Sequence, residues 1–139
     1  MVLKTHEMRS QLKSLFPSLL DWLPTDREYL PVDNMAELIE KYADPLNRYI
    51  PSLWECEEIA MAFIVDVRRG RLDNLHMIEP HFRKNLAIGE ALGTRWDGEK
   101  KSHHANIFFS MDGVYLCDLQ TKKIWKAKNG NDDIFFVRM

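Results

Sequence analysis

The chain has 139 residues, 45% of them hydrophobic and 29% charged, which predicts one globular domain with a single core. Its 19 basic and 21 acidic residues give a net charge of −2, without the basic excess typical of nucleic-acid-binding proteins. Two cysteines are too few for a disulfide framework. No segment approaches the roughly 20 apolar residues that span a bilayer, and the first residues lack a signal-peptide pattern. We therefore expect a soluble, cytoplasmic protein with free thiols and with no nucleic-acid or membrane partner.

Residues 1–46 are expected to be a helical N-terminal extension. Between residues 12 and 23 apolar side chains recur every three or four positions, which predicts an amphipathic helix. Pro17 either breaks this helix or begins a second one. The next apolar periodic segment predicts a further helix, capped at its start by Asp33 or Asn34.

Residues 47–139 are expected to form the core of the same single domain. An apolar helix face begins at Cys56 and the helix ends at Gly70. Residues 85–96 are short, apolar and interrupted by glycine, which predicts a strand with or without a bulge. The sequence M-D-G at 111–113 separates two β-rich runs and is the strongest hairpin signal in the chain. "DDIFFVRM" predicts the last strand. Helices followed by an antiparallel sheet indicate an α+β fold.

Cys56 stands where the helix of residues 56–70 is expected to begin. Unpaired backbone N–H groups and the positive end of the helix dipole favour a thiolate there. The thiolate is disfavoured by the negative charges nearby, those of Glu55, Glu57 and Glu58. Cys56 is therefore either a structural cysteine or a nucleophile, and a nucleophile needs a base nearby. Cys117 lies in the middle of a predicted strand and is expected to be a packing residue.

The predicted hairpin supplies a candidate base and a candidate acid. Strand alternation places His103 and Asp118 on the same face, where an imidazole could accept a thiol proton while a carboxylate holds its other nitrogen. The alternative is an ordinary strand histidine and a turn-capping aspartate. A metal site that combines Glu57 and Glu58 with both histidines is not expected, because His103 and His104 are adjacent and point to opposite faces. We expect no metal and no cofactor.

Two segments resemble a known family, the small papain-like, transglutaminase-like proteins, which include the C-terminal domain of a fungal agglutinin and short bacterial and phage proteins. "NRYIPSLWECEEIAMAF" is similar to their "RY…DCDDFA" segment, and "HHANIFFSMDGVYLCDLQTKKI" is similar to their "HAxN…DG…(D/E)PQT" hairpin. The resemblance covers residues 47–139. It implies a papain-like fold in which N-terminal helices precede a central helix packed on a C-terminal antiparallel sheet. In that fold the nucleophile begins the central helix, and the histidine and the acid come from the sheet.

The resemblance also implies roles for individual residues. Cys56 falls on the family's cysteine and Asp118 on its acid. The H-x-x-N spacing selects His103 as the base, whereas the His-Ala dipeptide selects His104. Strand alternation favours His103, because it shares a face with Asp118. Leu119 replaces the proline of the family's motif, a departure that could misplace a catalytic atom.

The function that follows from this reasoning is a thiol hydrolase or acyltransferase that acts on an amide bond of a protein or peptide. Cys56 would attack the carbonyl, and the histidine would take the thiol proton and later protonate the leaving amine. The backbone N–H of Cys56 would form an oxyanion hole together with a donor from the preceding loop. The candidate binding residues are Asn47, Tyr49, Trp54, Asn106 and Gln120.

A catalytically inactive scaffold of this fold, of phage or bacterial origin, is the alternative function. Such a chain would bind and block a protein or a small molecule. Trp22 and Tyr29 in the N-terminal region could form the partner surface or could cover the open side of the fold. The replacement Cys56→Ala distinguishes the two functions, because an inhibitor should tolerate it and an enzyme should not.

Overall fold

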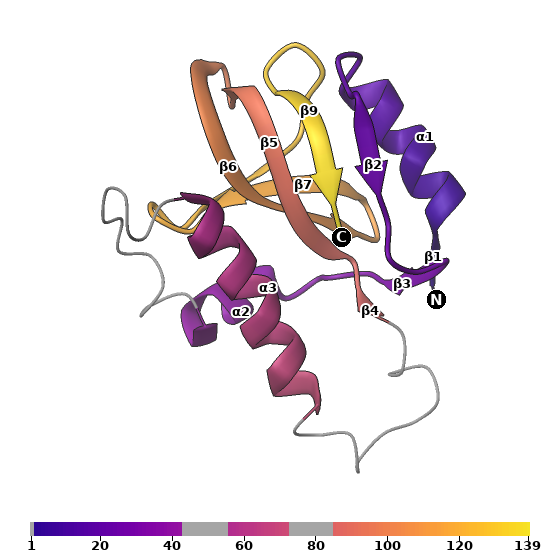
Figure 1. The fold of residues 1–139 in the computed structure, drawn as a ribbon, viewed down its shortest axis with the longest axis vertical. Helices are drawn as coiled ribbons and strands as arrows, with labels where there is room; N and C mark the ends of the chain where they lie inside the picture. Colours follow the sequence, from indigo (N-terminus) through magenta and orange to yellow (C-terminus); the bar gives the residue numbers. More distant parts are fainter. Residues whose placement is uncertain (1, 43–55, 73–84) are drawn as a thin grey trace.

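The computed structural model describes residues 2–42, 56–72 and 85–139, and strands make up most of its regular structure (Figure 1). The elements in chain order are β1 (Leu3–Lys4), α1 (Thr5–Leu15), β2 (Asp21–Leu23), β3 (Glu28–Leu30), α2 (Met35–Tyr42), α3 (Cys56–Leu72), β4 (Asn85–Leu86), β5 (Ile88–Trp96), β6 (Glu99–Ser110), β7 (Gly113–Asp118), β8 (Lys123–Lys126) and β9 (Asp133–Arg138). A six-stranded sheet has the order β2-β9-β5-β6-β7-β8, and a smaller sheet has the order β1-β3-β4. None of the helices in the described ranges is long and apolar enough to cross a membrane.

The N-terminal residues correct the expected arrangement of helices first and sheet second. α1 ends at Leu15, ahead of Pro17, which has no N–H group with which to continue a helix. Asp21–Leu23 instead forms β2, which pairs in parallel with β9 at the edge of the large sheet. Glu28–Leu30 forms β3, the middle strand of the small sheet. The α+β class with an N-terminal group of helices is therefore wrong for this fold, in which one large sheet is the main element. The expected boundary after residue 46 lies outside the described residues.

β5, β6 and β7 form the middle of the large sheet and confirm the predicted strands. β6 and β7 pair antiparallel around the predicted M-D-G turn. β5 pairs with β6 on one side and with the predicted last strand, β9, on the other, and both registers shift at Gly93. A Cβ atom at Gly93 would lie 2.5 Å from the carbonyl oxygen of Asp133. Glycine therefore allows β9 to approach the bulge closely.

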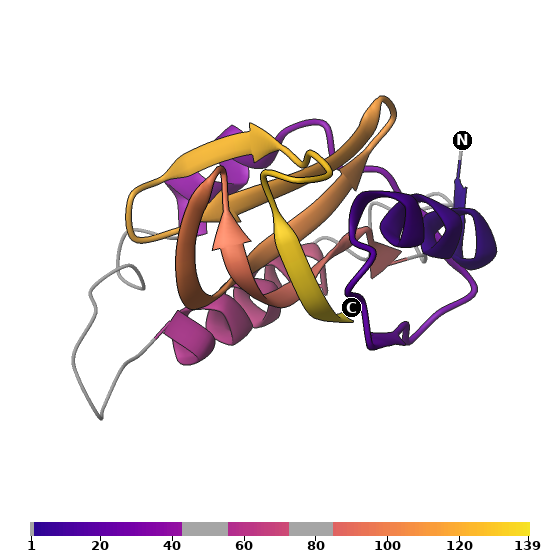
Figure 2. The same cartoon turned by 90° about the horizontal axis from the view of Figure 1, so that it is seen from above.

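Alternation along β6 divides the buried apolar side chains into two clusters, one on each face of the sheet. One cluster joins Ile107 of β6 to Leu12 of α1. The other joins Phe108 to Phe63 of α3 and Ile39 of α2. Figures 1 and 2 show α1 at one side of the molecule and α3 at the other.

The two aromatic residues considered for a partner surface are buried. Trp22 is 7% exposed, and its ring centroid lies 6.2 Å from that of Phe109. Tyr29 is fully buried, and its hydroxyl accepts the backbone N–H groups of Thr25 and Asp26 at 2.8 and 2.9 Å. Both residues are part of the interior and leave no exposed aromatic surface at these positions.

α3 begins at Cys56, as predicted, and its first turns are tied to the middle of the large sheet. Asn106 of β6 is fully buried. Its side-chain amide donates to the carbonyl of Ala60 in α3 at 3.1 Å and to the carbonyl of Gly89 in β5 at 3.0 Å. One side chain thus fixes the helix that carries Cys56 against the strand that carries both candidate histidines.

Candidate functional site

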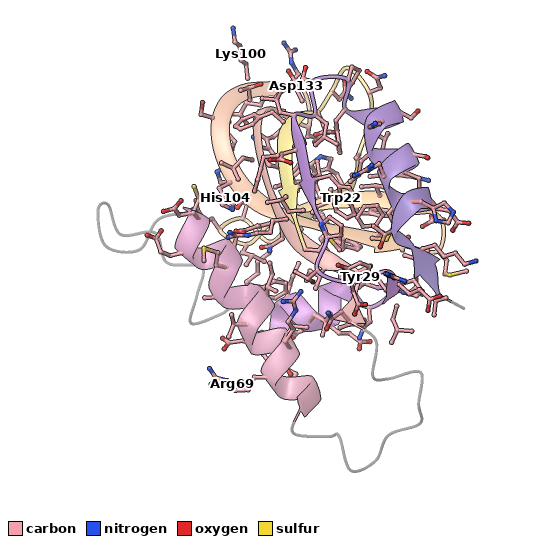
Figure 3. All side chains as sticks on the ribbon, turned by 45° about the vertical axis from the view of Figure 1, so that its right-hand side comes forward. Trp22, Tyr29, Arg69, Lys100, His104 and Asp133 are labelled. Carbon is pink, nitrogen blue, oxygen red and sulfur yellow. The ribbon has the colours of Figure 1, made fainter. Side chains whose placement is uncertain are left out.

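A hollow of about 310 Å³ opens beside the first turn of α3. Its lining residues are Cys56, Glu57, Leu92, Gly93, Ser102, His103, His104 and Phe135. Figure 3 shows His104 next to the start of α3. Leu92 and Phe135 are apolar, whereas the thiol, the carboxylate and the imidazoles are polar, and this mixture is typical of small-molecule sites. We call this hollow the Cys56 cleft.

A second, much smaller space lies between α3, β6 and β7. Its volume is about 10 Å³, and it shares Cys56, His103 and His104 with the Cys56 cleft. Asp118 and Gln120 also line it. A space of this size holds about one water molecule. Of the two spaces, only the Cys56 cleft has room for an organic ligand.

The structure brings together His103 and Asp118, the expected base and acid. Their atoms Nε2 and Oδ2 are 3.4 Å apart, and each side chain is 11% exposed. The alignment is too poor for a hydrogen bond, so the contact is ionic when the imidazole is protonated. Burial alone would raise the pKa of Asp118, but His103, the N–H of Gln120 and the charge of Lys101 outweigh burial and hold that pKa below its usual value. Asp118 is therefore an ionised partner of the imidazole at neutral pH.

A second histidine–carboxylate pair involves Glu90, which was not among the residues predicted from the sequence. Nε2 of His104 lies 2.7 Å from Oε2 of Glu90, and Arg138 forms an ion pair with the other carboxylate oxygen. Burial alone would raise the pKa of Glu90, but His104 and Arg138 outweigh burial and lower it. The available sequence signal was one acidic residue inside the otherwise apolar strand "AIGEALG".

The remaining predicted binding residues have different surroundings. Asn106 is a structural link between α3 and the sheet, and its Oδ1 has no hydrogen-bond partner within the described ranges. Gln120 lines the smaller space, where its backbone N–H donates to Asp118 at 3.0 Å. The three predicted loop residues fall outside the described residues, namely Asn47, Tyr49 and Trp54.

The two cysteines differ in their surroundings. Cys56 is partly exposed and lines both spaces. Cys117 is fully buried, and burial raises the pKa of its thiol far above the usual value. Cys56 is thus the thiol that a ligand in the cleft can reach. Among the residues that the structure describes, no three His, Cys, Asp or Glu side chains are grouped so that they could hold a metal ion.

No family model and no curated protein matches this chain. The solved structures that share its fold include the following two. One is the "PSL1a-E64 complex", with a TM-score of 0.72 and 16% identity over 99% of this chain and 50% of that chain. The other is Polyporus squamosus lectin bound to the human-type influenza-binding epitope Neu5Aca2-6Galb1-4GlcNAc, with a TM-score of 0.71 and 16% identity over 99% of this chain and 49% of that chain. The chain therefore spans about half the length of these proteins, and this level of identity shows the fold alone.

These structures correct the assignment to the papain-like, transglutaminase-like family, because the two solved structures just named are of a lectin. The ligand bound to Polyporus squamosus lectin is a glycan and not a protein or peptide. The expected thiol hydrolase or acyltransferase, and the alternative of a blocking scaffold, are corrected with it. The physical reason is that short motifs specify a few local positions, whereas the fold is set by how all the strands pair. The chain has the fold of about half of Polyporus squamosus lectin.

Proposed function

We propose that the chain is a ligand-binding module and that the Cys56 cleft is its binding site. The observation that supports this proposal is the cleft itself, a hollow of about 310 Å³ with apolar side chains beside polar ones. Apolar walls supply contact area, and a few polar groups fix the orientation of a ligand. The cleft is formed by α3 together with residues of β5, β6 and β9, so rigid elements hold its walls.

A glycan is the ligand class to test first. The lectin that shares the fold is bound to a sialylated glycan. A sugar ring offers an apolar face to a side chain such as Phe135, and its hydroxyl groups can exchange hydrogen bonds with Ser102, His103 and Glu57. Because this chain spans about half of that lectin, glycan binding has to be measured on this chain itself.

Titration calorimetry with Neu5Aca2-6Galb1-4GlcNAc and with Galb1-4GlcNAc tests glycan binding. Phe135→Ala should weaken binding about tenfold or more, because it removes an aromatic wall of the cleft. Phe136→Ala is the matched control, since Phe136 is partly buried on the same strand but does not line the cleft. Absence of binding for both sugars at millimolar concentration, or equal losses in the two variants, would contradict the proposal.

A specific observation favours a second function for the same cleft, namely covalent capture of an electrophile by Cys56. The thiol of Cys56 lines the cleft together with two imidazoles, those of His103 and His104. We propose that Cys56 is a nucleophile and that a neighbouring histidine accepts its proton. With an epoxide, the sulfur forms one S–C bond to a ring carbon, the C–O bond of that carbon breaks, and the histidine returns the thiol proton to the freed oxygen. PSL1a, which shares the fold, has been solved as a complex with E64.

Intact-mass measurement after incubation with the compound E64, an epoxide, tests covalent capture. The wild-type chain and Cys117→Ser should each gain one adduct, whereas Cys56→Ser should gain none. The pair of cysteine variants is matched, because each removes one thiol and keeps the other. Labelling that persists in Cys56→Ser, or no labelling of the wild-type chain, would refute capture by this thiol.

A further inference from the structure

We propose that Glu90 and Arg138 are positioning residues of the Cys56 cleft, and that they act through His104, which accepts the thiol proton of Cys56. This inference rests on the proposed reactivity of Cys56 and assigns the residues that produce it. It differs from the expectation that His103 accepts the thiol proton and that Asp118 orients this histidine.

The hydrogen-bond geometry determines which nitrogen of His104 is free. An ionised carboxylate only accepts hydrogen bonds, so the 2.7 Å contact with Glu90 requires a proton on Nε2 of His104. Arg138 only donates, and it occupies the other carboxylate oxygen. Its charge keeps Glu90 ionised and its contact keeps the carboxylate in place. A neutral imidazole with its proton on Nε2 has its lone pair on Nδ1, which is then the nitrogen available to a thiol.

The packing of α3 indicates that His104 lies on the face of the sheet from which Cys56 approaches. Asn106 points from β6 to the carbonyl of Ala60 in α3. His104 is two residues away from Asn106 on the same strand, so the two side chains share that face. His104 also lines the Cys56 cleft and the smaller space beside Cys56, and Figure 3 places it at the first turn of α3.

His103 is held on the other side of the strand by a different set of contacts. Its ring packs edge-on against Trp96, with centroids 5.3 Å apart and an interplanar angle of 80°. Nε2 of His103 lies 3.4 Å from the carboxylate of Asp118. The corresponding distance from Nε2 of His104 to the carboxylate of Glu90 is 2.7 Å. The His104 pair is therefore the better aligned of the two, and its carboxylate is fixed by a second cation.

The reaction of this site with iodoacetamide can be written with all atoms accounted for. Nδ1 of His104 takes the proton from Sγ of Cys56, which leaves a thiolate beside an imidazolium. The sulfur then forms a bond to the methylene carbon of the reagent, and iodide leaves with the electrons of the broken C–I bond. The imidazolium returns its proton to water. Within the described ranges, the charged and titratable groups around His104 are Glu90 on β5, Arg138 on β9, His103 on β6, Asp118 on β7, and Cys56 and Glu57 on α3.

The test compares two matched amide replacements in a Cys117→Ser background, with the rate of Cys56 alkylation by iodoacetamide measured from pH 5 to pH 10. Glu90→Gln should lower the rate at neutral pH about tenfold or more and move the profile to higher pH, because the charge that stabilises the imidazolium is lost. Asp118→Asn should change the rate by less than about threefold. The reverse ranking of the two variants would overturn the inference.

Two further measurements separate the possible failures. The alkylation rate of the urea-unfolded chain at each pH is the reference for an ordinary thiol. A folded wild-type rate no higher than this reference overturns the proposed reactivity and the inference together, whereas a fast wild type with an equally fast Glu90→Gln overturns the inference alone. If Glu90→Gln does not fold, ¹⁵N NMR of the wild-type imidazoles decides. A neutral His104 with its proton on Nε2 supports the inference, and one with its proton on Nδ1 overturns it.

Discussion

Asn106→Ala should destabilise the chain by about 2–4 kcal/mol. The side chain is fully buried and donates to two carbonyl groups, at 3.1 Å in α3 and at 3.0 Å in β5. Each buried hydrogen bond contributes about 1 kcal/mol net. Removing the buried amide also leaves a small cavity, which costs up to about 2 kcal/mol more when the neighbours do not close it.

Urea denaturation followed by circular dichroism measures this loss. With a slope of about 2 kcal/mol per molar urea, the midpoint should fall by about 1–2 M. Asn129→Ala is the matched control, because the amide of Asn129 is exposed and donates to the carbonyl of Ser14 at 3.1 Å. That replacement should cost less than about 0.5 kcal/mol. A difference of less than about 0.5 kcal/mol between the two variants would refute the role of Asn106 as the link between α3 and the sheet.

The described contacts support three more predictions. In the folded chain the pKa of Glu90 is lowered from its ordinary value of 4.5. The ionised carboxylate therefore stabilises the folded chain fully above pH 4.5, and this stabilisation is lost as the pH falls from 4.5 towards the lower pKa of the folded state. Urea midpoints between about pH 3 and pH 7 should therefore depend less on pH in Glu90→Gln than in the wild type, and equal dependence would contradict the lowered pKa. Iodoacetamide should modify Cys56 and spare Cys117 in the folded chain, as peptide mapping will show, because Cys117 is fully buried; modification of both at similar rates would show that the interior opens readily. Gly93→Ala should cost about 1–3 kcal/mol in urea unfolding, since the new Cβ would lie 2.5 Å from the carbonyl oxygen of Asp133, and an unchanged midpoint would show that β9 can move away at little cost.

The sequence by itself determined the elements whose cause is local. The M-D-G turn joins β6 and β7 because turn residues stand between two β-rich runs. α3 begins at Cys56, as its apolar periodicity predicted. Residues 85–96 form a strand as predicted, and the bulge at Gly93 is one of the two alternatives that its glycines left open. Each of these features depends on residues that are near one another in the chain, so periodicity and turn chemistry are enough to predict them.

The tertiary structure decided the pairings between segments that are far apart in the chain. Asp21–Leu23 was expected in a helix, but it forms a strand because β9 offers it an edge to pair with. Glu90 contacts His104 because β5 and β6 pair in one particular register. That register places Glu90 opposite Asn106, so that His104, two residues from Asn106 on the same face of β6, is its diagonal neighbour. Arg138 reaches the same carboxylate from β9. Backbone hydrogen bonds between strands act across any separation in sequence, so local patterns do not reveal them, and they determine both the fold and the residues that surround Cys56.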